Sequence, residues 1–167
     1  RVLLQAPRIL AIHLSAKRMS STMRESLWLT VTEVNGCRWC AYVHEGMAGA
    51  SGMSPEDIQL LLSSEDLERM ATLTKNQRAT LAYARAWAEQ DGEPPRGMRD
   101  QVLERLGQAA SRDLHALLRL IDFANRCGNT LDSLLHRLTH PRRLLEVWGA
   151  LHATVVGPHV PPSRLAG

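Results

Sequence analysis

The sequence lacks any apolar run long enough to cross a membrane. Its longest apolar stretches, LHALLRLI and LLEVWGALHA, are interrupted by charge or histidine well before the roughly 18 residues that a span requires. Basic residues exceed acidic ones by only three and are scattered except around HRLTHPRR at 136–143, a pattern more typical of a solvated face than of a nucleic-acid site. We therefore expect no membrane and no nucleic-acid partner.

Cysteine is also scarce. Three cysteines in 167 residues make an odd count without the dense spacing of a secreted disulfide scaffold. That usage favours a reducing setting, and we expect a cytoplasmic protein in which a close cysteine pair has a chemical function. The sequence contains no internal repeat and no low-complexity block. With 44% hydrophobic residues, it is long enough for a single domain with a real core.

Glycine and proline divide the chain into segments of about 10 to 16 residues, within which apolar residues recur at spacings of three and four. This pattern predicts an all-α fold. Residues 1–20 read as an amphipathic helix with a short leader, residues 21–155 as the main helical domain, and residues 156–167 as an irregular tail that lies on a neighbouring subunit. Helices are expected to begin at Ser54-Pro55 and at Thr74, which forms a capping box with Gln77. A later helix is expected to end at Gly128, followed by a separate segment from Thr130 to Leu138 and a last one that opens after Pro141.

The segment ESLWLTVTEV at 25–34 is ambiguous. Leu27, Leu29 and Val31 alternate, and valine and threonine favour strands, so the local pattern permits a strand. Leu27, Val31 and Val34 also fit the helical period, and the following Asn35-Gly36 is a good helix stop. We predict a helix here.

The stretch NGCRWCAYVHEG at 35–46 carries the candidate chemistry. If a helix starts just after Asn35-Gly36, Cys37, Cys40 and His44 share one face, within a sector of about 60°. Both cysteines would then lie near the first turn, where free backbone N–H groups and the helix dipole favour a nucleophilic thiolate. His44 can accept the thiol proton, and a carboxylate on its other ring nitrogen would fix its tautomer. Helix geometry alone leaves Glu25 and Glu33 open as that carboxylate.

The whole run RESLWLTVTEVNGCRWCAYVH, residues 24–44, resembles the signature of the carboxymuconolactone decarboxylase superfamily, in particular its alkylhydroperoxidase D-like (AhpD-like) branch. The shared pattern is Glu, eleven residues, Cys-x-x-Cys, three residues and His. Weaker similarity extends over about residues 21–138 and includes LLRLIDFANRCGNTLDSLL. The resemblance implies an AhpD-like helical bundle of about seven to eight helices in a homo-oligomer, often a trimer or hexamer.

The same resemblance implies a thiol-dependent peroxidase that reduces organic hydroperoxides in antioxidant defence. Cys40 would be the peroxidatic thiolate and Cys37 the residue that resolves its sulfenic acid into a Cys37–Cys40 disulfide. His44 would be the proton relay and Glu25 would orient it. An external dithiol, such as a lipoyl-bearing or thioredoxin-like protein, would restore the pair, with no cofactor or metal in the chain. The best-known members carry a histidine where this chain has Trp39, and the decarboxylase branch lacks the cysteine pair.

Other interpretations of the CxxC motif stay open. The chain could be a general thiol–disulfide oxidoreductase or redox sensor, or a non-enzymatic helical assembly in which the motif is a structural or metal-holding clip. A zinc site would use Cys37, Cys40, His44 and a glutamate, but the second knuckle typical of structural zinc is missing. A thioredoxin-like site would need a βαβ context that the sequence does not offer. Cys127 is expected to be a small core residue.

Overall fold

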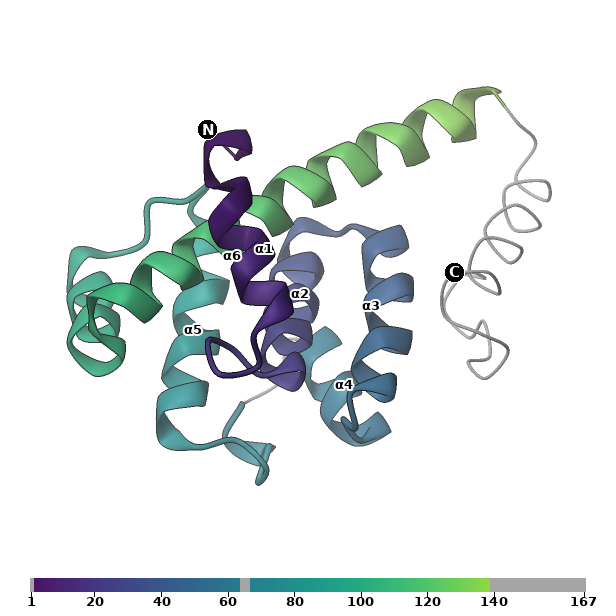
Figure 1. The fold of residues 1–167 in the computed structure, drawn as a ribbon. Coiled ribbons are helices and arrows are strands. Elements are labelled where there is room, and N and C mark those ends of the chain that lie inside the picture. Colours follow the sequence, from purple (N-terminus) through teal and green to yellow (C-terminus); the bar gives the residue numbers. More distant parts are fainter. Residues whose placement is uncertain (1, 64–66, 139–167) are drawn as a thin grey trace.

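The computed structural model describes residues 2–63 and 67–138, whose regular secondary structure is all helical (Figure 1). In chain order the elements are the 3-10 helix η1 (Leu3–Gln5), α1 (Ala6–Leu14), α2 (Ser21–Asn35), α3 (Arg38–Ala50), α4 (Pro55–Leu62), the 3-10 helix η2 (Leu67–Arg69), α5 (Lys75–Glu89) and α6 (Arg96–Leu138). The all-α prediction is confirmed. The described residues form six α-helices where seven to eight were expected. None of the described helices is both long and apolar enough to cross a membrane.

Helix α2 lies at the centre of the fold and contacts α3, α4, α5 and α6. Its eight consecutive residues from 25 to 32 are all buried, so it has no solvent-facing stripe. A helix that is buried on every side needs no apolar period of 3.6 residues. This burial explains why the local pattern of this segment was ambiguous, and the prediction of a helix is confirmed.

The helix starts predicted at Ser54 and Thr74 are confirmed, and each is stabilised by local hydrogen bonds. The Ser54 and Thr74 side chains accept from the backbone N–H groups of Asp57 and Gln77, and the Gln77 side chain completes the capping box. Helix α2 ends at Gly36, which has a left-handed conformation with a φ of 62°. A left-handed backbone conformation favours glycine, because glycine has no Cβ to clash with the backbone. The Asn-Gly signal therefore marks the turn that leads directly into the CxxC motif.

Two predicted boundaries are wrong. The segment from Thr130 to Leu138 is not a separate helix, because α6 continues through it. At the N-terminus, α1 spans only Ala6–Leu14, so the observed helix is shorter than the helix and leader predicted over residues 1–20. The helix expected after Pro141 and the tail at 156–167 lie outside the described residues.

Helix α6 consists of two arms, because Gly107 interrupts it with a φ of 74° and a ψ of 169°. The second arm runs across α2 and α3 and reaches the CxxC motif (Figure 1). Helix α1 packs on this arm, where Arg8 and Arg18 both bind the buried Asp113. Burial of Asp113 works to raise its pKa, but the hydrogen bonds from Arg18 and Arg8 outweigh this effect and lower it. Asp113 is therefore an ionised anchor for α1.

Candidate redox site

The turn between α2 and α3 places the first cysteine. The Cys37 N–H donates to the Thr32 carbonyl at 3.2 Å, and Cys37 is the N-cap of α3. Its Sγ accepts the Cys40 backbone N–H at 3.3 Å, as a capping oxygen would. Cys37 thus lies one position before the first helical turn rather than within it, and Cys40 lies within that turn, as expected. The unpaired N–H groups of a helix start favour negative charge on sulfur at this place.

Cys37 and Cys40 are joined by a disulfide, with their Cα atoms 5.3 Å apart. Both cysteines are buried, Cys37 with 1% and Cys40 with 6% of its surface exposed. The disulfide therefore lies wholly at the start of α3, and Cys40 is the more accessible of the two.

Glu25, and not Glu33, lies against His44. The Glu25 Oε2 atom is 2.7 Å from His44 Nδ1, and both side chains are buried. Glu33 faces another way and accepts a hydrogen bond from Arg85 at 3.1 Å. Glu25 comes from the first half of α2 and His44 from the middle of α3, so the packing of these two consecutive helices against each other creates the pair.

The carboxylate determines which nitrogen of His44 is free to accept a proton. Because a carboxylate accepts, His44 Nδ1 carries the hydrogen and donates to Glu25, which leaves the Nε2 lone pair available. His44 follows Cys40 by four residues in the same helix, and such residues have Cβ atoms about 5–6 Å apart. The arrangement provides a thiol, a base one turn away and an anion that orients the base.

Trp28 fixes the plane of the His44 ring, a contact that the sequence did not indicate. The two rings stack with centroids 3.9 Å apart and planes only 10° from parallel. Trp28 follows Glu25 by three residues on α2, so the two side chains are neighbours on the face of α2 that packs on α3. Glu25 and Trp28 together hold the ring from its edge and its face.

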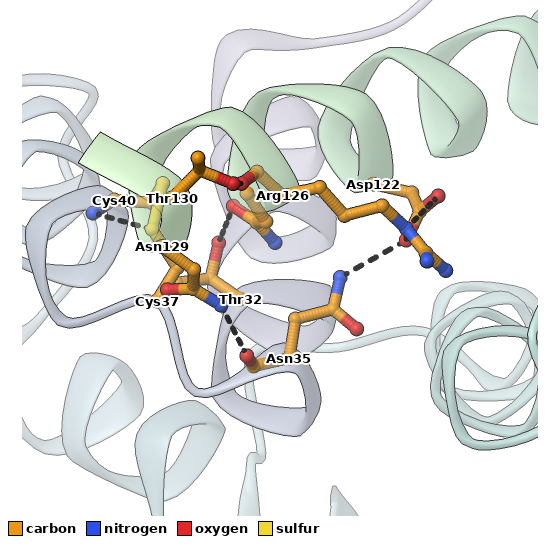
Figure 2. Close-up of a disulfide and its surroundings, with 9 residues drawn as sticks. Thr32, Asn35, Cys37, Cys40, Asp122, Arg126, Asn129 and Thr130 are labelled. Carbon is orange, nitrogen blue, oxygen red and sulfur yellow. Dashed lines mark hydrogen bonds and ion pairs between the residues drawn. A yellow bond between two sulfur atoms is a disulfide. The ribbon is translucent and has the colours of Figure 1, made fainter. Parts of the chain in front are cut away.

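Helix α6 closes the site from the other side. Gly128 packs on the disulfide so closely that a Cβ there would lie 2.8 Å from Cys37 Sγ and 3.1 Å from Cys40 Sγ. The next residue, Asn129, donates from Nδ2 to the Asn35 carbonyl at 2.9 Å, as Figure 2 shows beside the disulfide. A second link joins Thr32 Oγ1 to the buried Asn125 at 3.1 Å. The available signal was the glycine inside a helical pattern, since such a glycine often marks close packing.

Gly128→Ala is expected to destabilise the protein by about 1–3 kcal/mol, because a Cβ closer than 3 Å to sulfur forces α6 away from α3. Gly49→Ala is the matched control. Gly49 is also in a helix, but its Cβ would meet nothing within 4 Å, so alanine should stabilise by about 0.5–1 kcal/mol. Urea unfolding of both variants measures the difference.

A double-mutant cycle with Cys37→Ala tests the contact between Gly128 and the Cys37–Cys40 disulfide. Without the Cys37 Sγ atom, the closest neighbour of the new methyl group is gone and the destabilisation by Gly128→Ala should fall by about 1 kcal/mol or more. An equal loss in both backgrounds would show that Gly128 is needed for another reason.

Two further residue placements complete the site. Cys127 is exposed, so its prediction as a core residue is wrong; it precedes Gly128 on α6 and faces away from the core. Among the described residues, no group of three or more cysteine, histidine or acidic side chains is arranged to hold a metal ion. Trp39 is half-buried beside Gly128.

Comparisons with known proteins add no assignment: no model of a protein family, no curated protein and no solved structure matches this chain. The chemistry of the site therefore has to be inferred from its geometry and from the motif.

Proposed function

We propose that this protein is a thiol-dependent peroxidase that reduces organic hydroperoxides through Cys37 and Cys40. The observation that carries the proposal is the buried cysteine pair at the start of α3, followed one turn later by a histidine whose ring is held by a buried carboxylate. A thiol, a base and an orienting anion are the parts that nucleophilic sulfur chemistry requires. The resemblance of residues 24–44 to the AhpD-like signature supports the same reaction.

The reaction needs two steps that balance. The Cys40 thiolate attacks the terminal oxygen of the hydroperoxide, the O–O bond breaks, and the alkoxide leaves as an alcohol after it takes up the proton that His44 received from the thiol. Cys40 is then a sulfenic acid. Cys37 attacks the Cys40 sulfur, a disulfide forms and water leaves. One hydroperoxide thus consumes two thiols and yields one alcohol and one water.

Cys40 is assigned as the attacking residue for two reasons. It has the larger exposed fraction, 6% against 1% for Cys37, so a substrate reaches it first. It also lies in the first turn of α3 and four residues before His44, the spacing at which side chains on a helix are neighbours. Cys37, almost fully buried against Gly128, suits the resolving role.

Burial of the pair favours a small oxidant over a protein disulfide. Exchange with another folded protein requires its sulfur to approach in line with the S–S bond, and so little exposed surface leaves no room for a broad partner. A hydroperoxide is small enough to enter. The reductant must then be narrow, such as a dithiol on an extended arm, which fits a lipoyl-bearing protein better than a thioredoxin-like one.

The proposal includes a homo-oligomer, a trimer or hexamer as the family resemblance implies. Phe123, Leu131 and Leu134 on α6 are each about half exposed. They fall within a sector of about 80° of the helix, so they form one apolar face. Apolar side chains grouped on a surface are typical of interaction sites, and this face supports an interface between subunits.

The first test is a titration of the fully reduced protein with cumene hydroperoxide, followed by stopped-flow and by mass spectrometry. We expect disulfide formation between Cys37 and Cys40 with about one hydroperoxide consumed per chain. The exposed Cys127 is the internal standard for an ordinary thiol, and it should react much more slowly than the pair. Cys127→Ser should leave the fast reaction unchanged.

Two outcomes would contradict the proposal. A Cys37–Cys40 pair that reacts with cumene hydroperoxide no faster than Cys127, yet exchanges rapidly with lipoamide or glutathione disulfide, would indicate a general thiol–disulfide oxidoreductase or sensor. Zinc bound at one ion per chain in the protein as purified would indicate a metal-holding clip instead.

A further inference from the structure

A cleft lies far from the cysteine pair, where α1 meets the two arms of α6. It has a volume of about 740 Å³, large enough for a small organic molecule. Its walls come from η1, α1 and both sides of the bend at Gly107. His115, on its α6 wall, precedes Gly128 by 13 residues, which corresponds to about 20 Å along the helix. The cleft is therefore separate from the redox site.

Arginine dominates the cleft. Five arginines and one acidic residue line it: Arg8, Arg18, Arg99, Arg112, Arg119 and Asp100. Arg8 and Arg18 share the single carboxylate of Asp113. The guanidinium groups of Arg99, Arg112 and Arg119 form no hydrogen bond or ion pair with any residue that the structure describes. The cleft thus has a surplus of positive charge and of free N–H donors, the arrangement that attracts an anion.

The floor of the cleft is neutral and does not offset this charge. His115 Nδ1 lies 2.6 Å from the Ser111 carbonyl and its Nε2 lies 2.7 Å from the Tyr83 hydroxyl. The ring therefore donates to the carbonyl and accepts from Tyr83, which is the hydrogen-bonding pattern of a neutral histidine. Burial lowers the pKa of His115, and the charges of Arg99 and Arg119 lower it further. With His115 neutral, the charge of the cleft lining comes from the five arginines and from Asp100.

The cleft also has an apolar side. Leu4, Pro7 and Leu103 line this side, and Leu4 and Leu103 have 87% and 44% of their surfaces exposed. Exposed leucines beside free guanidinium groups suit a ligand that has both an anionic head and an apolar body. Gln5 also lines the cleft, and its Oε1 atom is buried without a hydrogen-bond partner among the described residues.

We propose that this cleft binds an amphipathic organic anion, with its carboxylate or phosphate head held by Arg99, Arg112 and Arg119 and its apolar part against Leu4 and Leu103. Arg112 and Arg119 are seven residues apart on one face of α6, and Arg99 approaches from the other arm. A head group between them bridges the two arms. The bend at Gly107 is what brings the three arginines to one cleft.

Isothermal titration calorimetry of the full chain tests this site with octanoate, octyl phosphate, octanol and inorganic phosphate. We expect saturable binding of octanoate or octyl phosphate, and weaker or no binding of octanol and of inorganic phosphate, because each lacks one half of the ligand. The double variant Arg112→Gln/Arg119→Gln should lower the affinity by about tenfold or more. Arg105→Gln is the matched control: Arg105 is an exposed arginine of α6 outside the cleft, and its loss should leave binding unchanged.

Comparison of the affinities for octanoate and octyl phosphate identifies the preferred head group, because the arginines should bind more tightly the head group whose geometry they match. The inference is overturned if neither amphiphile binds saturably, or if Arg105→Gln weakens binding as much as the double variant does, which would indicate attraction to the overall charge only. Octanol binding as tightly as octanoate would overturn it too. Binding in a Cys37→Ser/Cys40→Ser variant should be unaffected, so the result does not depend on the proposed peroxidase activity.

Discussion

Cys40→Ser is expected to abolish the fast reaction with cumene hydroperoxide, whereas Cys37→Ser should stop it one step later. Serine at position 40 removes the nucleophile, and the hydroxyl that replaces it is not ionised near neutral pH. Serine at position 37 leaves the nucleophile intact and removes only the residue that resolves its sulfenic acid. The two variants should therefore differ in product as well as in rate: an unreacted protein in the first case, and a protein carrying one added oxygen on Cys40 in the second.

Both variants should be made in a Cys127→Ser background. Cys127 is exposed and directly precedes Gly128, which packs on both sulfurs, so it could otherwise resolve the sulfenic acid in place of Cys37. Trapping with dimedone followed by peptide mass spectrometry identifies the oxidised residue. Fast consumption of hydroperoxide should remain in Cys37→Ser for a single turnover only.

The reverse pattern would exchange the two roles. If Cys37→Ser were inert and Cys40→Ser accumulated a sulfenic acid on Cys37, then the hydrogen bond from the Cys40 N–H to Cys37 Sγ would be the feature that activates the nucleophile. No sulfenic acid in either variant would remove the support for a peroxide-reacting thiol altogether.

The local geometry of the two cysteines and the histidine could be predicted from the sequence because Cys37, Cys40 and His44 lie within eight residues. Asn35-Gly36 ends one helix and starts the next, and the spacing of Cys37, Cys40 and His44 puts them on one face of that next helix. Both results follow from rules that hold over a few residues, such as the left-handed conformation of glycine and the 3.6-residue period. The capping box at Thr74 follows from the same kind of rule.

The parts that could not be predicted depend on segments that meet only in the folded protein. Helix geometry left Glu25 and Glu33 as equal partners for His44, since the choice depends on how α2 packs on α3 and on Arg85 of α5, which binds Glu33. Gly128 comes from more than 80 residues further along the chain. Its contact with the sulfurs is set by the path of α6 after the bend at Gly107.

The wrong boundaries have a related cause. Glycine is a frequent helix stop, so Gly128 suggested that a helix ends there and another begins at Thr130. In the folded protein Gly128 serves close packing rather than a turn, and α6 runs through it. A glycine can end a helix or allow a helix to pack closely on its neighbour, and tertiary packing determines which of the two occurs.

His44→Gln should slow oxidation of the cysteine pair by about 100-fold or more, because it removes the base that takes the thiol proton while it keeps a side chain of similar size. Glu25→Gln should slow it less, by about tenfold or more, because the amide oxygen can still accept from Nδ1 but carries no charge to hold one tautomer. Stopped-flow of the reduced proteins with cumene hydroperoxide measures both rates. Glu33→Gln is the control: Glu33 is an acid of the same helix that binds Arg85 instead of His44, and its loss should leave the rate within about twofold.

Nitrogen-15 NMR of the His44 ring separates positioning from simple structural damage. In the native protein and in Glu33→Gln, the Nδ1–H tautomer should dominate, because the Glu25 carboxylate accepts that hydrogen. In Glu25→Gln the amide group can also donate to Nδ1, so both tautomers should be populated while Trp28 keeps the ring stacked. A slow Glu25→Gln variant whose tautomer is unchanged would show that Glu25 acts through its charge alone. A rate equal to that of the native protein would remove Glu25 from the reaction, and an unaltered rate in His44→Gln would remove the proton relay.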